Sequence, residues 1–219
     1  MSDALQSETL HSQPKKQNTM EHIILTTIAL LSLVPIPCLH AQTVAPAKPG
    51  ELVNGDFSQR VGTGLPTGWS FTKTPWIDAQ KKEPKIPDGM TVTTLQEGSK
   101  AIVRITYKDN QRGCLVQVLD LPPRAKEARL KVTVRGEPDQ KDAKMAFPDA
   151  GFRFFNAAGK YLPERKSSDT PKTLSDKSWR EIEVKCDIPA GATSCNVILG
   201  NVNNTNGLFE FRGASVRFR

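Results

Sequence analysis

The chain has 219 residues, with 30 lysines and arginines against 23 aspartates and glutamates, so its formal net charge is +7. This length accommodates one ordinary domain with a leader, or one large all-β domain. The sequence contains three histidines, and all of them lie within the first 41 residues. If those residues are a cleaved leader, the mature chain has no histidine for a general base, a catalytic triad or dyad, or a zinc site.

Residues 1–41 have the features of a signal peptide. Two lysines precede an apolar segment at residues 23–34, and Ala41 completes a small-residue cleavage site. The apolar segment is shorter than the roughly 20 residues of a membrane-spanning helix, and two prolines end it. We therefore predict cleavage, no membrane span in the mature chain, and a secreted, periplasmic or cell-envelope location. Translation from Met20 instead of Met1 is an alternative, because the charged preface is long.

Removing the leader leaves 28 basic and 20 acidic residues, a net charge of +8. Such a surface favours acidic partners, for example an anionic polysaccharide. Nucleic acid is not an expected partner of an exported chain, and solubility alone is the alternative explanation of the charge. Three cysteines also remain, namely Cys114, Cys186 and Cys195. Buried thiols and a Cys186–Cys195 disulfide are both open, and the absence of a CxxC pair gives redox chemistry no support.

Residues 42–50 have the composition of a linker, and residues 51–219 consist of short segments in which apolar and polar residues alternate. In chain order, the predicted inward-facing sets are Ala101, Val103, Ile105 and Tyr107; Cys114, Val116 and Val118; Leu130, Val132 and Val134; Phe152 and Phe154; Ile182, Val184, Cys186 and Ile188; and Cys195, Val197 and Leu199. Glycine, proline and asparagine turns separate these strands. The pattern predicts one all-β domain, an antiparallel β-sandwich or jelly roll.

The last strand changes phase. Its inward-facing residues stand at odd positions up to Phe211 and at even positions from Ala214 onward. One extra residue must be absorbed between them, and Gly213 in a left-handed conformation would form the required β-bulge.

Several motifs follow one another in a particular order along residues 51–219. They are Asn54–Phe57, Pro66–Trp69, Gln117–Pro122, Phe155–Lys160, Trp179, Ile188–Ala192 and the closing strand Phe209–Arg219. In order and spacing they resemble the galactose-binding-like jelly roll of carbohydrate-binding modules, the broad group found beside bacterial glycanases. The resemblance implies a non-catalytic module that binds carbohydrate. It also implies that Trp69 and Trp179 pack under the sandwich.

Folds of this group often hold a structural calcium ion between the N-terminal motif and an acidic residue of the final strand. In this chain, Ser58 and Arg212 stand where acids are usual. Calcium needs several oxygen ligands, including carboxylates, so we expect no cofactor. The only residual ligand set is Asn54, Asp56 and Glu210. We expect the Arg212 guanidinium to pair with Asp56 in place of the ion.

Sugar recognition combines aromatic faces with planar polar groups. The candidate ligand-binding residues are Trp76, Arg104, Gln117, Arg153 and Tyr161. Trp76 and Tyr161 belong to irregular segments, and the other three are predicted to face outward from strands. Arginine matches the geometry of carboxylate or sulfate, so an acidic polysaccharide would suit them. The alternatives are that Trp76 plugs the end of the core and that the arginines form a solvated face.

The predicted function is therefore a secreted, non-catalytic carbohydrate-binding module. A first alternative is a structural or adhesion module of the cell envelope that binds other proteins. A second is a polysaccharide lyase that uses Tyr107 or Tyr161. The acidic residues form no recognisable catalytic pair of the kind that glycosidases need, so we predict that the chain is not an enzyme.

Overall fold

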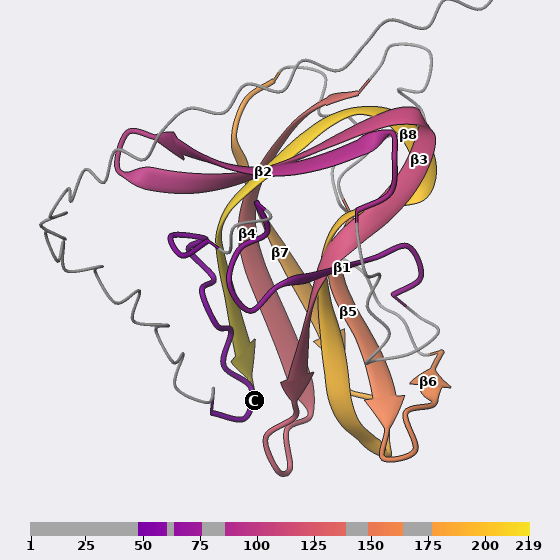
Figure 1. The fold of residues 1–219 in the computed structure, drawn as a ribbon. Helices are drawn as coiled ribbons and strands as arrows, with labels where there is room; N and C mark the ends of the chain where they lie inside the picture. Colours follow the sequence, from indigo (N-terminus) through magenta and orange to yellow (C-terminus); the bar gives the residue numbers. More distant parts are fainter. Residues whose placement is uncertain (1–47, 61–63, 76–85, 139–148, 164–176) are drawn as a thin grey trace, which may run out of the picture. The chain divides into compact units, whose positions relative to one another are not determined.

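The computed structural model describes residues 48–60, 64–75, 86–138, 149–163 and 177–219, which form strands and no helix (Figure 1). The strands are β1 (Ser70–Thr72), β2 (Met90–Glu97), β3 (Lys100–Asp120), β4 (Glu127–Pro138), β5 (Asp149–Asn156), β6 (Tyr161–Leu162), β7 (Arg180–Asp187) and β8 (Ala192–Phe218). The predicted signal peptide and most of the predicted linker lie outside the described residues. The described residues contain no helix that is long and apolar enough to cross a membrane.

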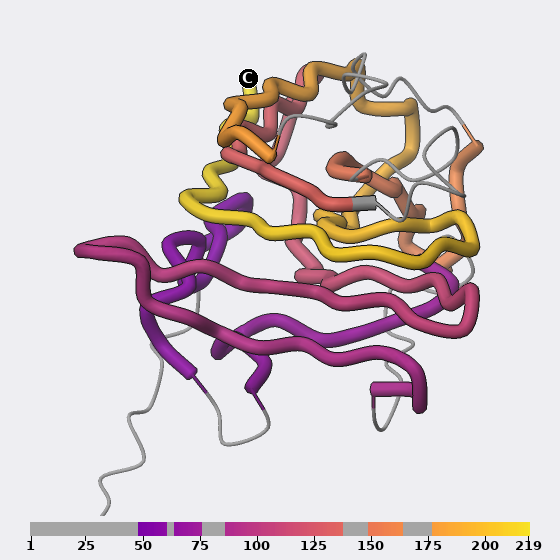
Figure 2. The backbone as a smooth tube through the Cα atoms, turned by 90° about the horizontal axis from the view of Figure 1, so that it is seen from above, coloured from indigo at the N-terminus to yellow at the C-terminus, as the bar shows by residue number. Residues whose placement is uncertain are grey.

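The two long strands β3 and β8 build the sandwich, because each contributes to two layers. In the first layer, the first half of β3 pairs with β2 and with the second half of β8, which continues to β4 and β7. In the second layer, the second half of β3 pairs with β1 and with the first half of β8, which continues to β5 and β6. All pairings are antiparallel, and Figure 2 shows β3 and β8 running side by side.

A break in β3 separates the two layers. Asp109 and Asn110 have φ values of 57° and 56°, and the register with β8 shifts between Tyr107 and Gly113. The Tyr107 hydroxyl donates a hydrogen bond to the Gly113 carbonyl oxygen at 2.6 Å and accepts one from the Asn201 backbone N–H at 2.9 Å. This buried side chain therefore fixes the point at which the strands pass from one layer to the other.

One hydrophobic core lies between the layers, as the alternation predicts. The inward-facing residues of β4, β5 and β7 and of the first half of each long strand belong to one buried cluster. Trp69 is buried in this cluster, and its ring centroid lies 5.5 Å from that of Phe57. The predicted structural role of Trp69 is confirmed.

The predicted phase of one strand is wrong. In the second half of β3, Leu115 and Leu119 face the core, whereas Cys114 and Val116 form a separate apolar cluster with Ile198. By the strand alternation this cluster lies on the outer face of the second layer. The error arises because both faces of this segment bury apolar residues, so the sequence carries no clear period of two.

Two further predictions are resolved by the backbone and the thiols. The register between β4 and β8 shifts next to Arg212, and Gly213 has a φ of 61°, so the predicted β-bulge is confirmed. Cys114, Cys186 and Cys195 are buried and occur as free thiols, so the structure contains no Cys186–Cys195 disulfide. Burial raises the pKa of Cys114 and Cys195 far above the usual range, which makes these thiols unreactive.

Candidate functional site

The outer face of the second layer brings together more of the predicted site residues than any other described surface. On this face Arg153 of β5 stands directly opposite Asn196 of β8, and Phe155 stands opposite Tyr161 of β6. We call the surface formed by these four residues and by the apolar cluster of Val116 and its neighbours the candidate face. It combines a guanidinium, a carboxamide, aromatic rings and an apolar floor.

Arg153 is held rigidly in this face. Its side chain is only 2% exposed, its Nη1 donates a hydrogen bond to the Phe152 carbonyl oxygen at 2.8 Å, and its Nη2 lies 3.5 Å from Asp149 Oδ2. A buried guanidinium needs such partners, because desolvation of an unpaired charge is costly. Arg153 faces outward, as predicted, but it is buried and does not lie on a solvated strand face.

Asn196 connects the strand to the segment that contains Trp76. Its Nδ2 donates a hydrogen bond to the Pro75 carbonyl oxygen at 3.0 Å, and Pro75 is itself buried. Its Oδ1 is buried and finds no hydrogen-bond partner among the described residues, and the same holds for the nearby Thr74 Oγ1. Buried polar atoms normally have partners, so an ordered water molecule is the partner expected for these two oxygens.

Two aromatic side chains form part of the candidate face. The rings of Phe155 and Tyr161 are tilted at 58°, with their centroids 5.9 Å apart. Phe155 is completely buried, whereas Tyr161 is half-buried. Trp76 lies outside the described residues, as do residues 139–148 and 164–176.

Gln117 does not belong to the candidate face. Its side chain points inward at the edge of the sandwich and is 5% exposed. Its Oε1 accepts a hydrogen bond from the Val53 backbone N–H at 2.7 Å, and its Nε2 donates to the carbonyl oxygens of Val53 and Gly68. The prediction that it faces outward is wrong, because the inward-facing positions in this half of β3 are the odd-numbered ones and not those of Cys114 and Val116. Gln117 instead holds the N-terminal motif against β3.

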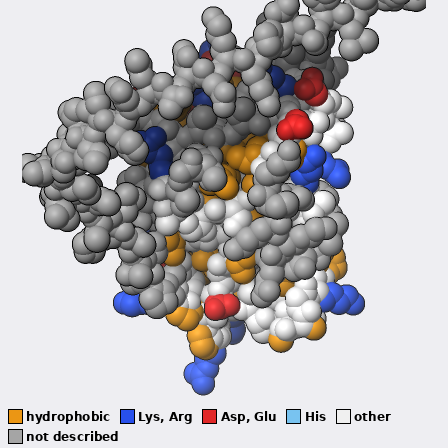
Figure 3. Space-filling view, in the orientation of Figure 1, with side chains coloured by type: hydrophobic (Ala, Val, Ile, Leu, Met, Phe, Trp, Pro, Cys, Tyr) orange, Lys and Arg blue, Asp and Glu red, His pale blue; other side chains and the backbone are white. Residues whose placement is uncertain are grey.

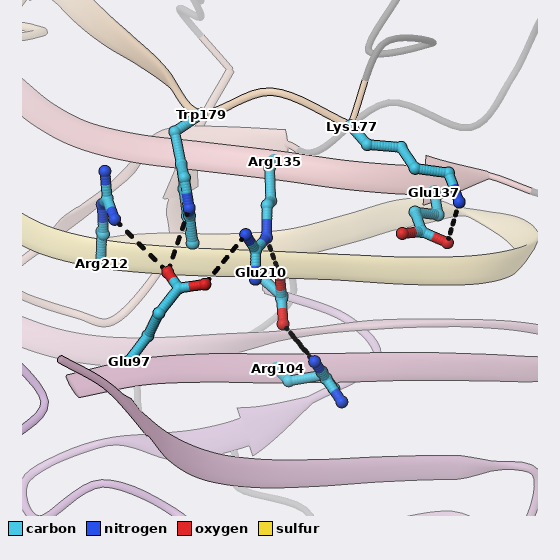
Figure 4. Close-up of polar contacts among 8 residues, drawn as sticks. All are labelled: Glu97, Arg104, Arg135, Glu137, Lys177, Trp179, Glu210 and Arg212. Atoms are coloured by element: carbon cyan, nitrogen blue, oxygen red, sulfur yellow. Dashed lines mark hydrogen bonds and ion pairs between the residues drawn. The ribbon is translucent and has the colours of Figure 1, made fainter. Parts of the chain in front are cut away.

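Arg104 lies on the opposite side of the sandwich, on the outer face of the first layer. Its Nε and Nη2 lie 2.8 Å and 2.7 Å from Glu210 Oε1, and Arg135 from the neighbouring strand donates to Glu210 Oε2 (Figure 4). Burial raises the pKa of Glu210, but the hydrogen bonds from Arg135 and Arg104 outweigh it and hold the pKa below its usual value. Arg104 is therefore outward-facing, as predicted, and engaged in an ion pair.

Trp179 belongs to the same face as Arg104 and not to the core. Its ring lies between the guanidinium carbons of Arg135 and Arg212, which are 4.3 Å and 4.1 Å from the ring centroid (Figure 4). The indole N–H donates to Glu97 Oε2 at 3.2 Å. The prediction that Trp179 packs under the sandwich is wrong, because both of its faces are covered by arginines on the outside of the sheet.

The residues of the weak calcium alternative are used for other contacts. Both polar atoms of the Asn54 side chain bond to the backbone of Gln59 or Thr67. Asp56 accepts from the backbone and hydroxyl of Ser58, and Glu210 is held by two arginines. No cluster of three acidic, cysteine or histidine side chains suited to a metal occurs in the described part of the chain.

Arg212 interacts with Glu97 at 3.6 Å, so its predicted pairing with Asp56 is not observed. The structure thus gives the residual calcium ligands no shared site. The side-chain oxygen atoms that could coordinate the ion already accept hydrogen bonds, from the N-terminal loop in Asn54 and Asp56 and from arginines in Glu210.

The lyase alternative depends on a tyrosine that removes a proton. Burial raises the pKa of Tyr107 well above its usual value, and its hydroxyl is engaged by Gly113 and Asn201. Tyr107 is therefore a structural residue. Tyr161 is partly exposed on the candidate face.

In the view of Figure 3, described lysine and arginine side chains lie mostly toward the margins, and hydrophobic side chains are visible between the grey atoms in the middle. Asn196 and Asp149 were not among the predicted site residues. Asn196 carries the signal of a polar residue at an outward position between Cys195 and Val197.

No family model matches the chain, and no curated protein matches its sequence. The tandem CBM22-1–CBM22-2 domain of Paenibacillus barcinonensis Xyn10C is a similar solved structure, with 13% identity and a TM-score of 0.51 over 80% of this chain and 48% of that chain. The enzymatically active domain of bacteriophage CBA120 tailspike protein 4 is similar over 78% of this chain and 22% of that chain, with 10% identity and a TM-score of 0.51. The chain therefore spans about half of the first and about a fifth of the second. The fold predicted from the sequence, a β-sandwich like that of carbohydrate-binding modules, is confirmed.

Proposed function

We propose that this domain is an exported, non-catalytic module that binds carbohydrate on the candidate face. The observation that carries the proposal is the hydrogen bond from Asn196 to Pro75. It anchors Pro75, the residue that precedes Trp76 in the chain, to the β8 position that stands opposite Arg153. Tyr161, another predicted ligand-binding residue, belongs to the candidate face.

The chemistry of the face suits a sugar. A pyranose ring presents an apolar face to aromatic and aliphatic side chains, and its hydroxyls need planar donors and acceptors. Tyr161 supplies a partly exposed aromatic ring, and the buried side chains of Arg153, Asp149 and Asn196 form the polar layer beneath this face. The side chains are held by their own hydrogen bonds, which reduces the entropy lost on binding.

An acidic polysaccharide is the target class that we propose. The mature chain has a net charge of +8, and arginine is the side chain best matched to carboxylate and sulfate groups. Two points favour binding without catalysis, namely the lack of histidine after residue 41 and the structural role of Tyr107.

The test measures retention of the mature domain in affinity gels that contain neutral or uronate-rich polysaccharides, followed by titration calorimetry. Trp76→Ala and Tyr161→Ala are each expected to lower the affinity for the polysaccharide. Truncating an aromatic hot-spot residue costs about 2 kcal/mol of binding free energy, which corresponds to a loss of more than tenfold in affinity. Trp179→Ala is the matched control, because it removes a tryptophan from the opposite layer. It should bind as the wild type does at temperatures where it is folded.

Other outcomes identify the alternatives. If no polysaccharide retains the domain and an envelope protein co-purifies with it, the domain is an adhesion module and the proposal is wrong. If a uronate polymer develops the ultraviolet absorbance of an unsaturated sugar, the domain is a lyase. Loss of that signal in Tyr161→Phe would then assign the base.

A further inference from the structure

A charged hollow lies on the outer face of the first layer, on the side of the sandwich opposite the candidate face. It has a volume of about 300 Å³, which is at the small end of ligand pockets. The residues that line it are Arg129, Lys131, Glu183, Ser215, Arg217 and Arg219. We call it the basic pocket, since four of its side chains are cationic and one is anionic.

The strand register concentrates positive charge at this position. Arg129 of β4 stands directly opposite Arg217 of β8 on one side and Lys185 of β7 on the other. Like charges that face each other across strands destabilise a sheet. A row of three cations is therefore unfavourable unless anions neutralise it.

The protein's own carboxylates neutralise only part of this row. Glu127 accepts a hydrogen bond from Arg129 and lies 2.9 Å from Lys185 Nζ. Glu183 lies 3.8 Å from Arg129 Nη1 and 3.7 Å from Lys131 Nζ. The carboxylates of Glu127 and Glu183 thus neutralise cations of β4 and β7, on one side of the pocket.

The β8 side of the pocket keeps its charge. Arg217 and Arg219 are exposed, and neither side chain forms an ion pair or hydrogen bond within the described ranges. The backbone that carries them is nevertheless fixed, because the Arg219 carbonyl oxygen accepts from the backbone N–H groups of Lys126 at 2.6 Å and Glu127 at 3.0 Å. Two guanidinium groups are therefore available at a firmly placed strand end.

We propose that the basic pocket binds the carboxylate or sulfate group of an acidic glycan as a second site, separate from the candidate face. This proposal rests on the proposed function only in assigning the anion to a glycan. Planar guanidinium groups bind such oxyanions in a bidentate manner, and Ser215 contributes a hydroxyl to the same hollow. Binding would also relieve the repulsion between Arg129 and Arg217.

The test titrates the mature domain with three ligands at matched ionic strength, namely an oligogalacturonate, a neutral oligosaccharide of equal length, and sodium sulfate. The double variant Arg217→Gln/Arg219→Gln should lose roughly tenfold in affinity for the oligogalacturonate, since a charge-assisted hydrogen bond is worth about 1.5 kcal/mol or more. Its affinity for the neutral sugar should not change. The matched control is Lys48→Gln/Lys108→Gln, which removes two exposed cations elsewhere and should bind all ligands as the wild type does.

The outcomes separate this proposal from the previous one. Equal oligogalacturonate affinity in the wild type and the Arg217/Arg219 double variant would overturn the basic pocket as a site, whatever the candidate face binds. If the double variant and the lysine control lose the same affinity for the oligogalacturonate, the loss reflects net charge alone, and this outcome would also overturn the basic pocket as a site. If neither oligosaccharide binds but sulfate binds in a manner that depends on Arg217 and Arg219, the pocket is an anion site and the carbohydrate function fails.

Discussion

Asn196 Nδ2 donates a hydrogen bond to the Pro75 carbonyl oxygen at 3.0 Å, across 121 positions of the chain. This contact joins the first half of β8 to the end of the segment that follows β1, on the outside of the sandwich. Because the donor is buried, the bond has little competition from water. It therefore sets where the chain enters the segment that contains Trp76.

Asn196→Ala is expected to lower the free energy of unfolding by about 1–2 kcal/mol, as for the loss of a hydrogen bond that leaves a buried acceptor unpaired. If Asn196 also positions the candidate face, the variant loses glycan affinity at temperatures where it remains folded. Urea unfolding and calorimetric titration measure the two effects. Ser194→Ala, two residues earlier on the same face of β8, should leave both unchanged.

Glu210 is expected to make stability depend on acid pH. Its pKa in the folded state is lowered by Arg135 and Arg104 despite burial, so its contribution is complete above the pKa of the unfolded state, near 4.3. It is lost as the pH falls through the lower folded-state pKa. Glu210→Gln should cost about 3 kcal/mol at pH 7, as for breaking a buried ion pair.

The measurement is urea unfolding at pH 7, 5 and 3. Glu210→Gln should lose less stability than the wild type between pH 5 and pH 3, because the titrating group is gone. Glu181→Gln is the control, since its side chain is 66% exposed and lies 3.6 Å from Lys131. A wild type and Glu210→Gln variant with parallel pH profiles would contradict this account.

Trp179 is expected to stabilise the first layer through Arg135 and Arg212. Each cation–π contact at a partly exposed site contributes about 0.5–1 kcal/mol, so Trp179→Ala should cost about 1–2 kcal/mol. Trp179→Phe keeps a ring between the guanidinium groups and loses only the hydrogen bond to Glu97, so it should cost less. Thermal unfolding measures both, and equal losses in the two variants would exclude the stacking contribution.

The sequence predicts the sheet best where one face alone is buried. On β7, Ile182, Val184 and Cys186 alternate with exposed charges, and the structure buries these three. From Cys114 to Gln117 both faces of β3 are buried, so this run has no readable period of two, and the predicted orientations of Gln117 and Val118 are wrong. Burial of both faces, not a weak signal, limits prediction there.

The site is less predictable than the fold because it depends on long-range contacts. The arginine at position 153 faces outward as its strand alternation predicts, but its pairing with Asn196 requires the register of β5 against β8. The sequence also cannot reveal that Arg135 and Arg212 cover both faces of Trp179, since three strands must be in register to bring them together. Motif position alone assigned that tryptophan to the core.

The break in β3 depends on a glycine. Gly113 has a φ of 153°, and a Cβ atom there would lie 2.2 Å from the Phe71 ring. Gly113→Ala should therefore cost about 3 kcal/mol, the upper end of the cost of overpacking, because backbone strain adds to the clash. Gly213→Ala meets open space at a φ of 61°, so about 1 kcal/mol is expected. Chemical unfolding compares the two, and an equal cost would contradict the steric argument.

Calcium is expected to have no effect on this domain, in contrast to many folds of its type. The side chain of Asn54 is saturated by the loop backbone, and the Glu210 carboxylate is neutralised by two arginines. Coordination would have to break these contacts and bring a divalent cation near Arg212, which raises the electrostatic cost. The thermal midpoint should be the same in millimolar calcium and in chelator. A rise in the midpoint with calcium that disappears in Asp56→Asn would show that the loop binds the ion after all.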